Sequence, residues 1–142
     1  MPRLVGAILE SQSILGTVTA GTVITKGDVL DKSGNVLQAA TSSSTIHTIV
    51  GVAAETIDTA ASTILFVPIV PFAQLWEFDT TNNTATTQRY ESAILGANAA
   101  TLNNTDSDVT GPTAIFTIAN VVGAAADKKV IGWFNRLGPT ST

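Results

Sequence analysis

The chain has 142 residues, of which 44% are hydrophobic and only 13% are charged, and its formal net charge is −4. Disordered chains are usually rich in charge and poor in apolar residues, so this composition indicates a folded protein of one domain or two very small ones. The basic residues form no cluster larger than the pair Lys128 and Lys129, which argues against a nucleic-acid partner and against a polybasic membrane-binding segment.

The sequence also lacks the features of a membrane-spanning or disulfide-bonded protein. Its longest apolar run, residues 64–75, contains two prolines and is shorter than the roughly 20 residues of a spanning helix. An acidic Glu10 follows the short apolar start, which does not fit a secretory signal peptide. The chain has no cysteine, so disulfides and thiolate zinc sites are excluded. We therefore expect synthesis in a reducing cytoplasm, with no membrane partner.

The first half of the chain predicts strands. Residues 4–9 form a short apolar run that suits a strand or an extended arm. Residues 29–37 predict a hairpin, because Asp31 and Gly34 favour a type I turn with a bulge between two apolar segments. Residues 45–53 alternate in the manner of a half-buried strand.

The middle of the chain continues this pattern. Residues 64–70 are rich in β-forming side chains, but Pro68 lacks an amide donor, which favours a sheet edge or a bulge. Residues 75–79 alternate again and bring Trp76 and Phe78 to one face.

The second half contains the one helix candidate. Residues 79–87 are a Thr and Asn tract that predicts an exposed loop. Residues 90–102 are rich in alanine and could place apolar side chains on one helical face, but Gly96 and Asn98 weaken a helix there. A polar loop at 103–110 follows, and then strands at 113–122 and 129–135.

Many short strands separated by turn signals, about 8–12 residues apart, are typical of an all-β sandwich or barrel. We predict an all-β protein with long loops and at most one short helix. Residues 1–19 would be an N-terminal arm or first strand, residues 20–136 a small β-barrel domain, and residues 137–142 a polar tail. A self-comparison aligns residues 46–55 with residues 118–127, which leaves open two repeated β units, although chance matching in alanine-rich sequence is the favoured explanation.

No arrangement of residues predicts catalysis. His47 is the only histidine, and the serines at 42–44 lack the glycine-flanked elbow of a nucleophile. The paired acids fit turns and solvated strand faces better than a catalytic cleft, and these pairs are Asp28 with Asp31, Glu77 with Asp79, and Asp106 with Asp108. We expect no enzyme activity, no catalytic residue and no cofactor.

Two loops carry oxygen ligands at alternate positions, as hard-cation loops do. They are residues 31–35 and residues 104–108. Neither has the glycine position or the closing glutamate of an EF-hand loop. We therefore expect no metal site.

Five segments resemble a known family. Lys26-Gly27-Asp28-Val29-Leu30 leads through a turn to Val36-Leu37-Gln38-Ala39-Ala40, and Ile49-Val50-Gly51-Val52-Ala53 follows. In the second half, Ile115-Phe116-Thr117-Ile118 precedes a short Asp-Lys turn and Val130-Ile131-Gly132-Trp133-Phe134. This pattern over residues 20–136 resembles the barrel core of the capsid decoration proteins, or cement proteins, of tailed bacteriophages.

The resemblance implies a small β-barrel or β-tulip-like fold, a homotrimer, and a position on the outer surface of an icosahedral phage head. There the protein would bind the major capsid protein and stabilise the head by bridging capsomers. It would be made in the cytoplasm of the host bacterium and found in the virion. The family has no catalytic residues to carry over.

Two groups of side chains are candidates for contact with the capsid or with another subunit. An N-terminal arm could add a strand to a neighbour's sheet edge. The two bulky aromatics suit either the core or a subunit interface, where tryptophan is enriched. These candidates are Leu4, Val5, Ile8 and Leu9 in the arm, and Trp76 and Phe78 in the middle of the chain.

A second function remains open from the sequence. The chain could be a trimeric tail-fibre or adhesin-type module that binds glycans of the host surface. Such a site needs an exposed aromatic beside carboxylates and amides, and Trp76-Glu77 near Asn82-Asn83 offers that combination.

Overall fold

The computed structural model describes residues 2–7, 13–71, 73–105 and 109–135, and for residues 3–7 it describes the backbone. Within these ranges the protein is all-β, as predicted, with eleven strands and two three-residue 3₁₀ turns. No helix in these ranges is long and apolar enough to cross a membrane. The elements are β1 (Arg3–Ala7), β2 (Ile14–Thr17), β3 (Val29–Ser33), β4 (Val36–Ala39), β5 (Ile49–Ala53), β6 (Thr63–Pro68), β7 (Gln74–Thr80), η1 (Thr86–Gln88), β8 (Ser92–Leu95), β9 (Thr101–Asn103), β10 (Phe116–Val122), η2 (Ala125–Asp127) and β11 (Lys129–Phe134).

The second half of the chain, together with β1 from the first half, forms a six-stranded sheet with the order β1-β7-β11-β10-β8-β9. A parallel pairing of β9 with the end of β7, at Asp79 and Thr80, closes five of these strands into a barrel. Strand β1 pairs with the first part of β7, with Arg3 opposite Glu77 and Ala7 opposite Gln74. Residues 3–7 therefore serve as a strand of the chain's own sheet.

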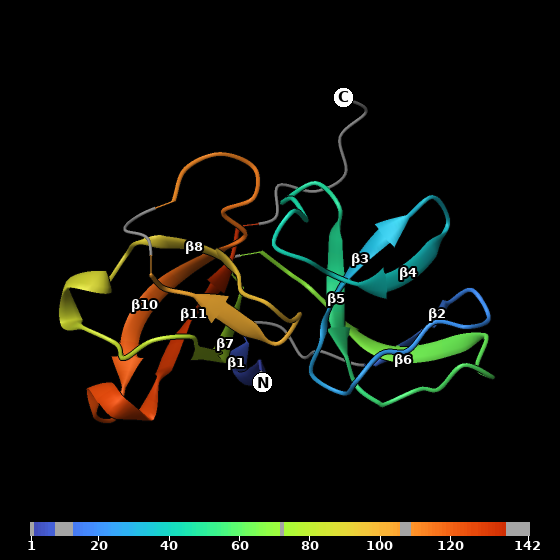
Figure 1. Ribbon diagram of the computed structural model, residues 1–142, viewed down its shortest axis with the longest axis horizontal. Coiled ribbons are helices and arrows are strands. Elements are labelled where there is room, and N and C mark those ends of the chain that lie inside the picture. Colours follow the sequence, from blue (N-terminus) through green and yellow to red (C-terminus); the bar gives the residue numbers. More distant parts are fainter. Residues whose placement is uncertain (1, 8–12, 72, 106–108, 136–142) are drawn as a thin grey trace.

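The first half forms a five-stranded sheet with the order β2-β6-β5-β3-β4, which lies on the other side of the molecule in Figure 1. Its two outer strands curl toward each other. A methyl group added at Gly16 in β2 would lie 2.5 Å from Leu37 Cδ1 in β4. Residues 46–55 and 118–127, which align with each other in sequence, contribute to different sheets.

Strands β3 and β5 of the five-stranded sheet contribute side chains to two hydrophobic clusters, one on each of their faces. Val29 and Val52 pack into a cluster with the aromatic residues of the six-stranded sheet, whereas Leu30 and Ala53 pack into a second cluster inside the five-stranded sheet. Strands buried on both faces have continuous apolar sequence rather than alternation. This double burial explains the uninterrupted Ile-Val-Gly-Val-Ala run of β5.

The helix candidate over residues 90–102 does not form a helix. The structure has β8 and β9 there, joined by a tight connection, with Leu95 paired to Leu102. Burial alternates along β8, so that Ala93 and Leu95 face the core. Of the four alanines in this range only Ala93 lies in a strand, and the other three belong to the connection between β8 and β9. Tertiary packing therefore overrides weak helix propensity.

Two local details also differ from the prediction. The hairpin loop is only Gly34 and Asn35, between the paired residues Ser33 and Val36, and Gly34 has φ +63°. The turn is therefore a two-residue loop without the predicted bulge. Strand β6 is an interior strand, and it accommodates Pro68 because this residue is its last and lies beyond the reach of β2.

Candidate functional site

Where the structure describes them, the predicted contact residues lie in the paired strands β1 and β7. Leu4 and Val5 belong to β1, and the backbone of Leu4 pairs opposite Trp76. Ile8 and Leu9 lie outside the described residues. Trp76 and Phe78 are 2% and 0% exposed. These aromatic side chains are thus unavailable to a partner.

The interface role and the glycan role considered for Trp76, and the interface role for Phe78, are therefore wrong in this fold. The Trp76 ring meets Phe134 edge-on at 5.7 Å, and Phe78 meets Phe116 at 4.8 Å, between ring centroids. Trp76 Nε1 donates to Gln74 Oε1 at 3.3 Å. The alternation of β7 shows that both rings share a face, but it does not reveal that this face points inward.

The structure contains an open groove of about 500 Å³ beside the turn that follows β7. None of the described residues that line it is charged. Apolar lining comes from the β8–β9 hairpin, at Ile94, Leu95, Gly96 and Ala97. Hydrogen-bonding side chains come from both halves of the chain, and they are Ser42, Thr81, Asn82, Asn103 and Thr105.

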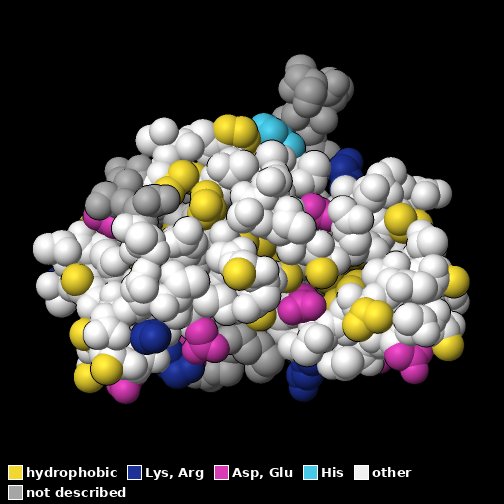
Figure 2. All heavy atoms as spheres, in the orientation of Figure 1, with side chains coloured by type: hydrophobic (Ala, Val, Ile, Leu, Met, Phe, Trp, Pro, Cys, Tyr) yellow, Lys and Arg dark blue, Asp and Glu magenta, His cyan; other side chains and the backbone are white. Residues whose placement is uncertain are grey.

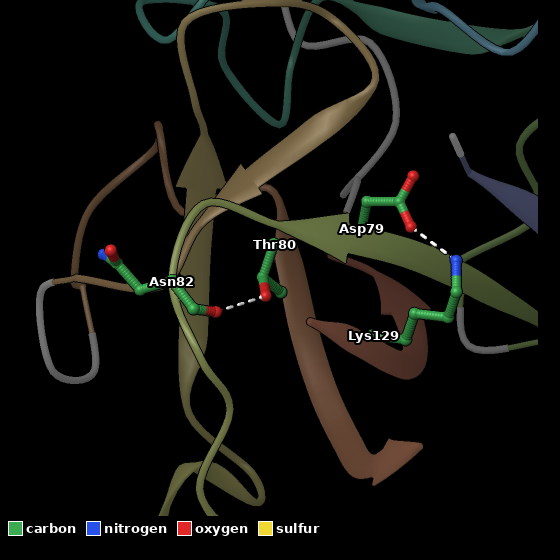
Figure 3. Close-up of polar contacts among 4 residues, drawn as sticks. All are labelled: Asp79, Thr80, Asn82 and Lys129. Atoms are coloured by element: carbon green, nitrogen blue, oxygen red, sulfur yellow. Dashed lines mark hydrogen bonds and ion pairs between the residues drawn. The ribbon is translucent and has the colours of Figure 1, made fainter. Parts of the chain in front are cut away.

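A buried amide, Asn104, organises the rim of this groove. Its Oδ1 accepts from the Asn82 amide at 2.9 Å and from Thr81 Oγ1 at 3.3 Å. Its Nδ2 donates to the carbonyls of Asn82 and Asn83 at 3.1 and 3.2 Å. The carbonyl of Asn82 also accepts from Thr80 Oγ1 at 2.7 Å, as Figure 3 shows. The turn therefore has a fixed backbone.

This network leaves the Asn82 side chain directed away from Thr80 (Figure 3). Its Nδ2 donates to Thr105 Oγ1 at 2.5 Å across the rim. Two residues that line the groove, Gly96 and Thr81, lie close together. A methyl group added at Gly96 would lie 3.1 Å from Thr81 Cγ2. Such an arrangement offers amides and hydroxyls without charge, which suits a neutral polar ligand.

Sequence reasoning treated this region as an exposed loop. A usable signal was present, because Asn-Asn-Thr occurs at residues 82–84 and again at residues 103–105. The two triplets are adjacent in space through the hydrogen bonds of Asn104. Nothing in local sequence predicts that pairing.

The loop that carries Ser42 to the groove is tied to a buried carboxyl group. Ser44 Oγ donates to Asp31 Oδ2, and the Thr41 amide donates to Ser44 Oγ at 2.9 Å. Asp31 is buried, and its Oδ1 accepts no hydrogen bond from the described residues. The serines at 42–44 thus belong to an anchored turn.

The predicted oxygen-rich loops do not assemble into a cluster in the part of the chain that the structure describes. Asp31 points into the protein, and Asp106 and Asp108 lie outside the described residues. Within the described ranges, no three His, Asp or Glu side chains come together.

One ion pair joins β7 to β11 at the barrel surface. Lys129 Nζ lies 2.6 Å from Asp79 Oδ1 (Figure 3). Partial burial raises the pKa of Asp79, but hydrogen bonds and positive charge, those of Lys129 among them, lower it by more. The pKa of this carboxyl therefore lies below its ordinary value.

The remaining surface is poor in charge. Figure 2 shows few charged side chains on the visible face, and some of them lie together near its lower edge. Several large apolar side chains are exposed, and they are Ile14, Leu15, Val23, Val70, Leu75 and Tyr90.

In comparisons with known proteins, no family model matches the chain and no curated protein matches it in sequence.

Proposed function

We propose that the protein is a structural virion protein that binds the outside of an icosahedral phage head and stabilises it by bridging capsomers. Its partner is the major capsid protein, and it acts as a homotrimer. The proposal rests on the resemblance of five segments to capsid decoration proteins.

The observation that carries the proposal is where these segments lie in the fold. Three of them, at residues 26–30, 36–40 and 49–53, supply the adjacent strands β3, β4 and β5. Val29 pairs opposite Val52, and Lys32 pairs opposite Leu37. The two C-terminal segments supply the paired strands β10 and β11. The resembling segments thus overlap β3, β4 and β5, which are neighbours in the five-stranded sheet, and β10 and β11, which are neighbours in the six-stranded sheet.

The glycines of two resembling segments, Gly51 and Gly132, have a packing role. This role supports treating the two segments as a structural pattern. A methyl group at Gly51 would lie 2.5 Å from both Phe66 Cδ2 and the Val67 carbonyl oxygen. One at Gly132 would overlap the carbonyl oxygen of Thr117. Neighbouring backbones approach so closely that only glycine fits.

The surface is consistent with docking on a protein shell. Exposed apolar side chains and sparse charge favour contacts whose strength depends little on salt, because screening acts on exposed charges. Each contact would be modest, and a trimer would gain affinity by engaging several capsomers at once.

The direct test is co-sedimentation with empty phage heads purified without the protein. We expect saturable binding in a fixed ratio to the capsid protein, and decorated heads should withstand a higher temperature than bare heads. Heads of an unrelated phage serve as the control. Failure to sediment with heads of any candidate phage, at micromolar protein, would contradict the proposal.

A second candidate function, glycan binding, is favoured by one observation, the uncharged groove beside Asn82. A glycan array with the wild-type protein and an Asn82→Ala variant tests it. Binding of neutral glycans that the variant loses would support this function. Head binding without glycan binding would exclude it.

A further inference from the structure

Tyr90 combines high exposure with an unfavourable backbone conformation. Its side chain is 73% exposed, the highest value among the large apolar side chains of the described residues. Its φ is +67°, in the left-handed region. Bulky residues seldom adopt this region, and strained residues of this kind gather at functional sites.

The surrounding strands hold Tyr90 in that conformation. Its amide donates to the Ile118 carbonyl at 2.6 Å, and the Ile118 amide donates to the Glu91 carbonyl at 2.9 Å. The pairing of β10 with β11 shifts register between Ile118 and Asn120, so that a bulge lies beside these bonds. Bulges are used to re-aim side chains. The fold therefore fixes the backbone from which the exposed tyrosine side chain projects.

Arg89 is held next to it. Its Nε donates to Asn120 Oδ1 at 2.9 Å, and that oxygen also accepts from the Val121 amide at 2.9 Å. Among the described residues this is the only hydrogen bond of the guanidinium group. The terminal nitrogens of Arg89 remain available in a fixed orientation, which favours a two-point bond to a carboxylate.

The segment that carries both residues lies at one end of the molecule. The turn η1 and the start of β8 are at the left end of the long axis in Figure 1, away from the five-stranded sheet. The neighbouring residues 81–87 are uncharged, and all but Thr84 are exposed. Interface centres are depleted in Lys, Asp and Glu and enriched in Tyr and Arg. This composition favours a protein partner.

We propose that Tyr90 and Arg89 form the anchor that binds a neighbouring capsid protein on the head, and this inference rests on the proposed function. The ring of Tyr90 enters an apolar recess of that protein, and the guanidinium group of Arg89 pairs with a carboxylate beside the recess. The left-handed backbone is retained because it aims the ring.

The test compares binding of variants to empty heads, together with their melting temperatures and native masses. Tyr90→Gly removes the ring and suits the backbone, because glycine adopts positive φ at no steric cost. We expect its melting temperature to stay the same or rise, while its affinity for heads falls roughly tenfold or more. Arg89→Lys keeps the charge but removes the two terminal nitrogens that could bind both oxygens of a carboxylate, so it should weaken binding severalfold. The control is Lys32→Ala, which alters an exposed side chain of the five-stranded sheet and should leave affinity unchanged.

The outcomes separate the two claims. Wild-type protein that fails to bind heads overturns both the proposed function and the anchor. Wild-type protein that binds, with Tyr90→Gly and Arg89→Lys binding equally well, overturns the anchor alone. Loss of the trimer in Tyr90→Gly would mean that the ring contacts a second copy of this chain, which also overturns the proposal. Tyr90→Phe keeps the ring, and retained binding in this variant supports the anchor even if Tyr90→Gly fails to fold.

Discussion

The six-stranded sheet packs around aromatic rings, whereas the five-stranded sheet encloses mainly aliphatic side chains. Phe78, Phe116 and Phe134 meet one another edge-to-face, with centroids 4.8 to 5.7 Å apart. The second cluster consists of side chains such as Ile24 and Ile64, with Phe66 as its one aromatic member among the described residues. Edge-to-face pairs contribute beyond the area that they bury, by about 0.5–1.5 kcal/mol each.

This difference matches the distribution of candidate sites. The strained Tyr90 and most of the groove belong to the six-stranded sheet and its connections. A backbone held in an unfavourable conformation needs a scaffold that determines it fully. Interlocking rings and a closed barrel provide that scaffold, and the five-stranded sheet supplies a wall through β3 and β5.

The largest expected effect comes from breaking the aromatic cluster. Phe78→Ala should lower the free energy of unfolding by about 3–5 kcal/mol, because it leaves a cavity and removes two ring contacts. The matched variant in the other sheet is Phe66→Ala, for which we expect a smaller loss. Urea denaturation measures both. Equal losses in the free energy of unfolding would show that the ring contacts contribute no stability beyond that of the buried area.

The glycines extend the comparison to the backbone. In Gly132→Ala the new methyl group would overlap the carbonyl oxygen of Thr117, which belongs to the paired strand and cannot move away. In Gly16→Ala the nearest atoms are the ends of the Leu37 and Phe66 side chains, which can shift. We expect Gly132→Ala to cost about 1–3 kcal/mol and Gly16→Ala clearly less. The reverse order in melting temperature would contradict the close approach of β10 and β11.

In the five-stranded sheet, the hydrogen bond between Ser44 and Asp31 can be tested by substitution. Ser44→Ala removes the donor to the buried carboxyl of Asp31, and an unmade buried hydrogen bond costs about 1–3 kcal/mol. Ser42→Ala alters the same loop without touching that bond and serves as the control. Chemical denaturation should show a loss for Ser44→Ala alone. A neutral result would mean that the carboxyl of Asp31 does not depend on this loop.

The smallest effect concerns the ion pair on the barrel surface. The lowered pKa of Asp79 means that its contribution to stability is present above the ordinary value of 3.8 and is lost as pH falls through the folded-state value. Asp79→Asn should therefore lower stability at neutral pH by less than about 1 kcal/mol, since both side chains are partly exposed. Urea midpoints measured across the acid range should show the stability difference between wild type and Asp79→Asn shrinking as pH falls. A stability difference that does not change with pH would rule out the ion pair as its cause.

The fold class followed from the sequence because strand periodicity is local. Alternation in residues 75–79 and apolar runs in 49–53 indicate strands, and turn residues separate them. Barrel closure did not follow, because the parallel pairing of Asp79 with Thr101 joins residues far apart in sequence. Local sequence also does not show that residues 90–102 form strands instead of a helix, because β8 pairs with the distant strand β10 as well as with β9.

The candidate sites were harder to predict than the fold. Periodicity showed that Trp76 and Phe78 share a face but not that this face is inside. Tyr90 stood out only once its backbone conformation and exposure were known, because both depend on the bond to Ile118. Sites that depend on long-range pairing leave little trace in the local pattern.

The central claim is that the protein bridges capsomers of an assembled head, and its affinity for mature shells, immature shells and free capsid subunits tests that claim most directly. We predict tight binding to mature shells and weak binding to the other two, because simultaneous contacts can raise affinity by about 10²–10⁴ only where the sites are correctly spaced. Binding should change little between low and high salt, given the sparse surface charge. Equal affinity for free subunits and mature shells would contradict the bridging mechanism.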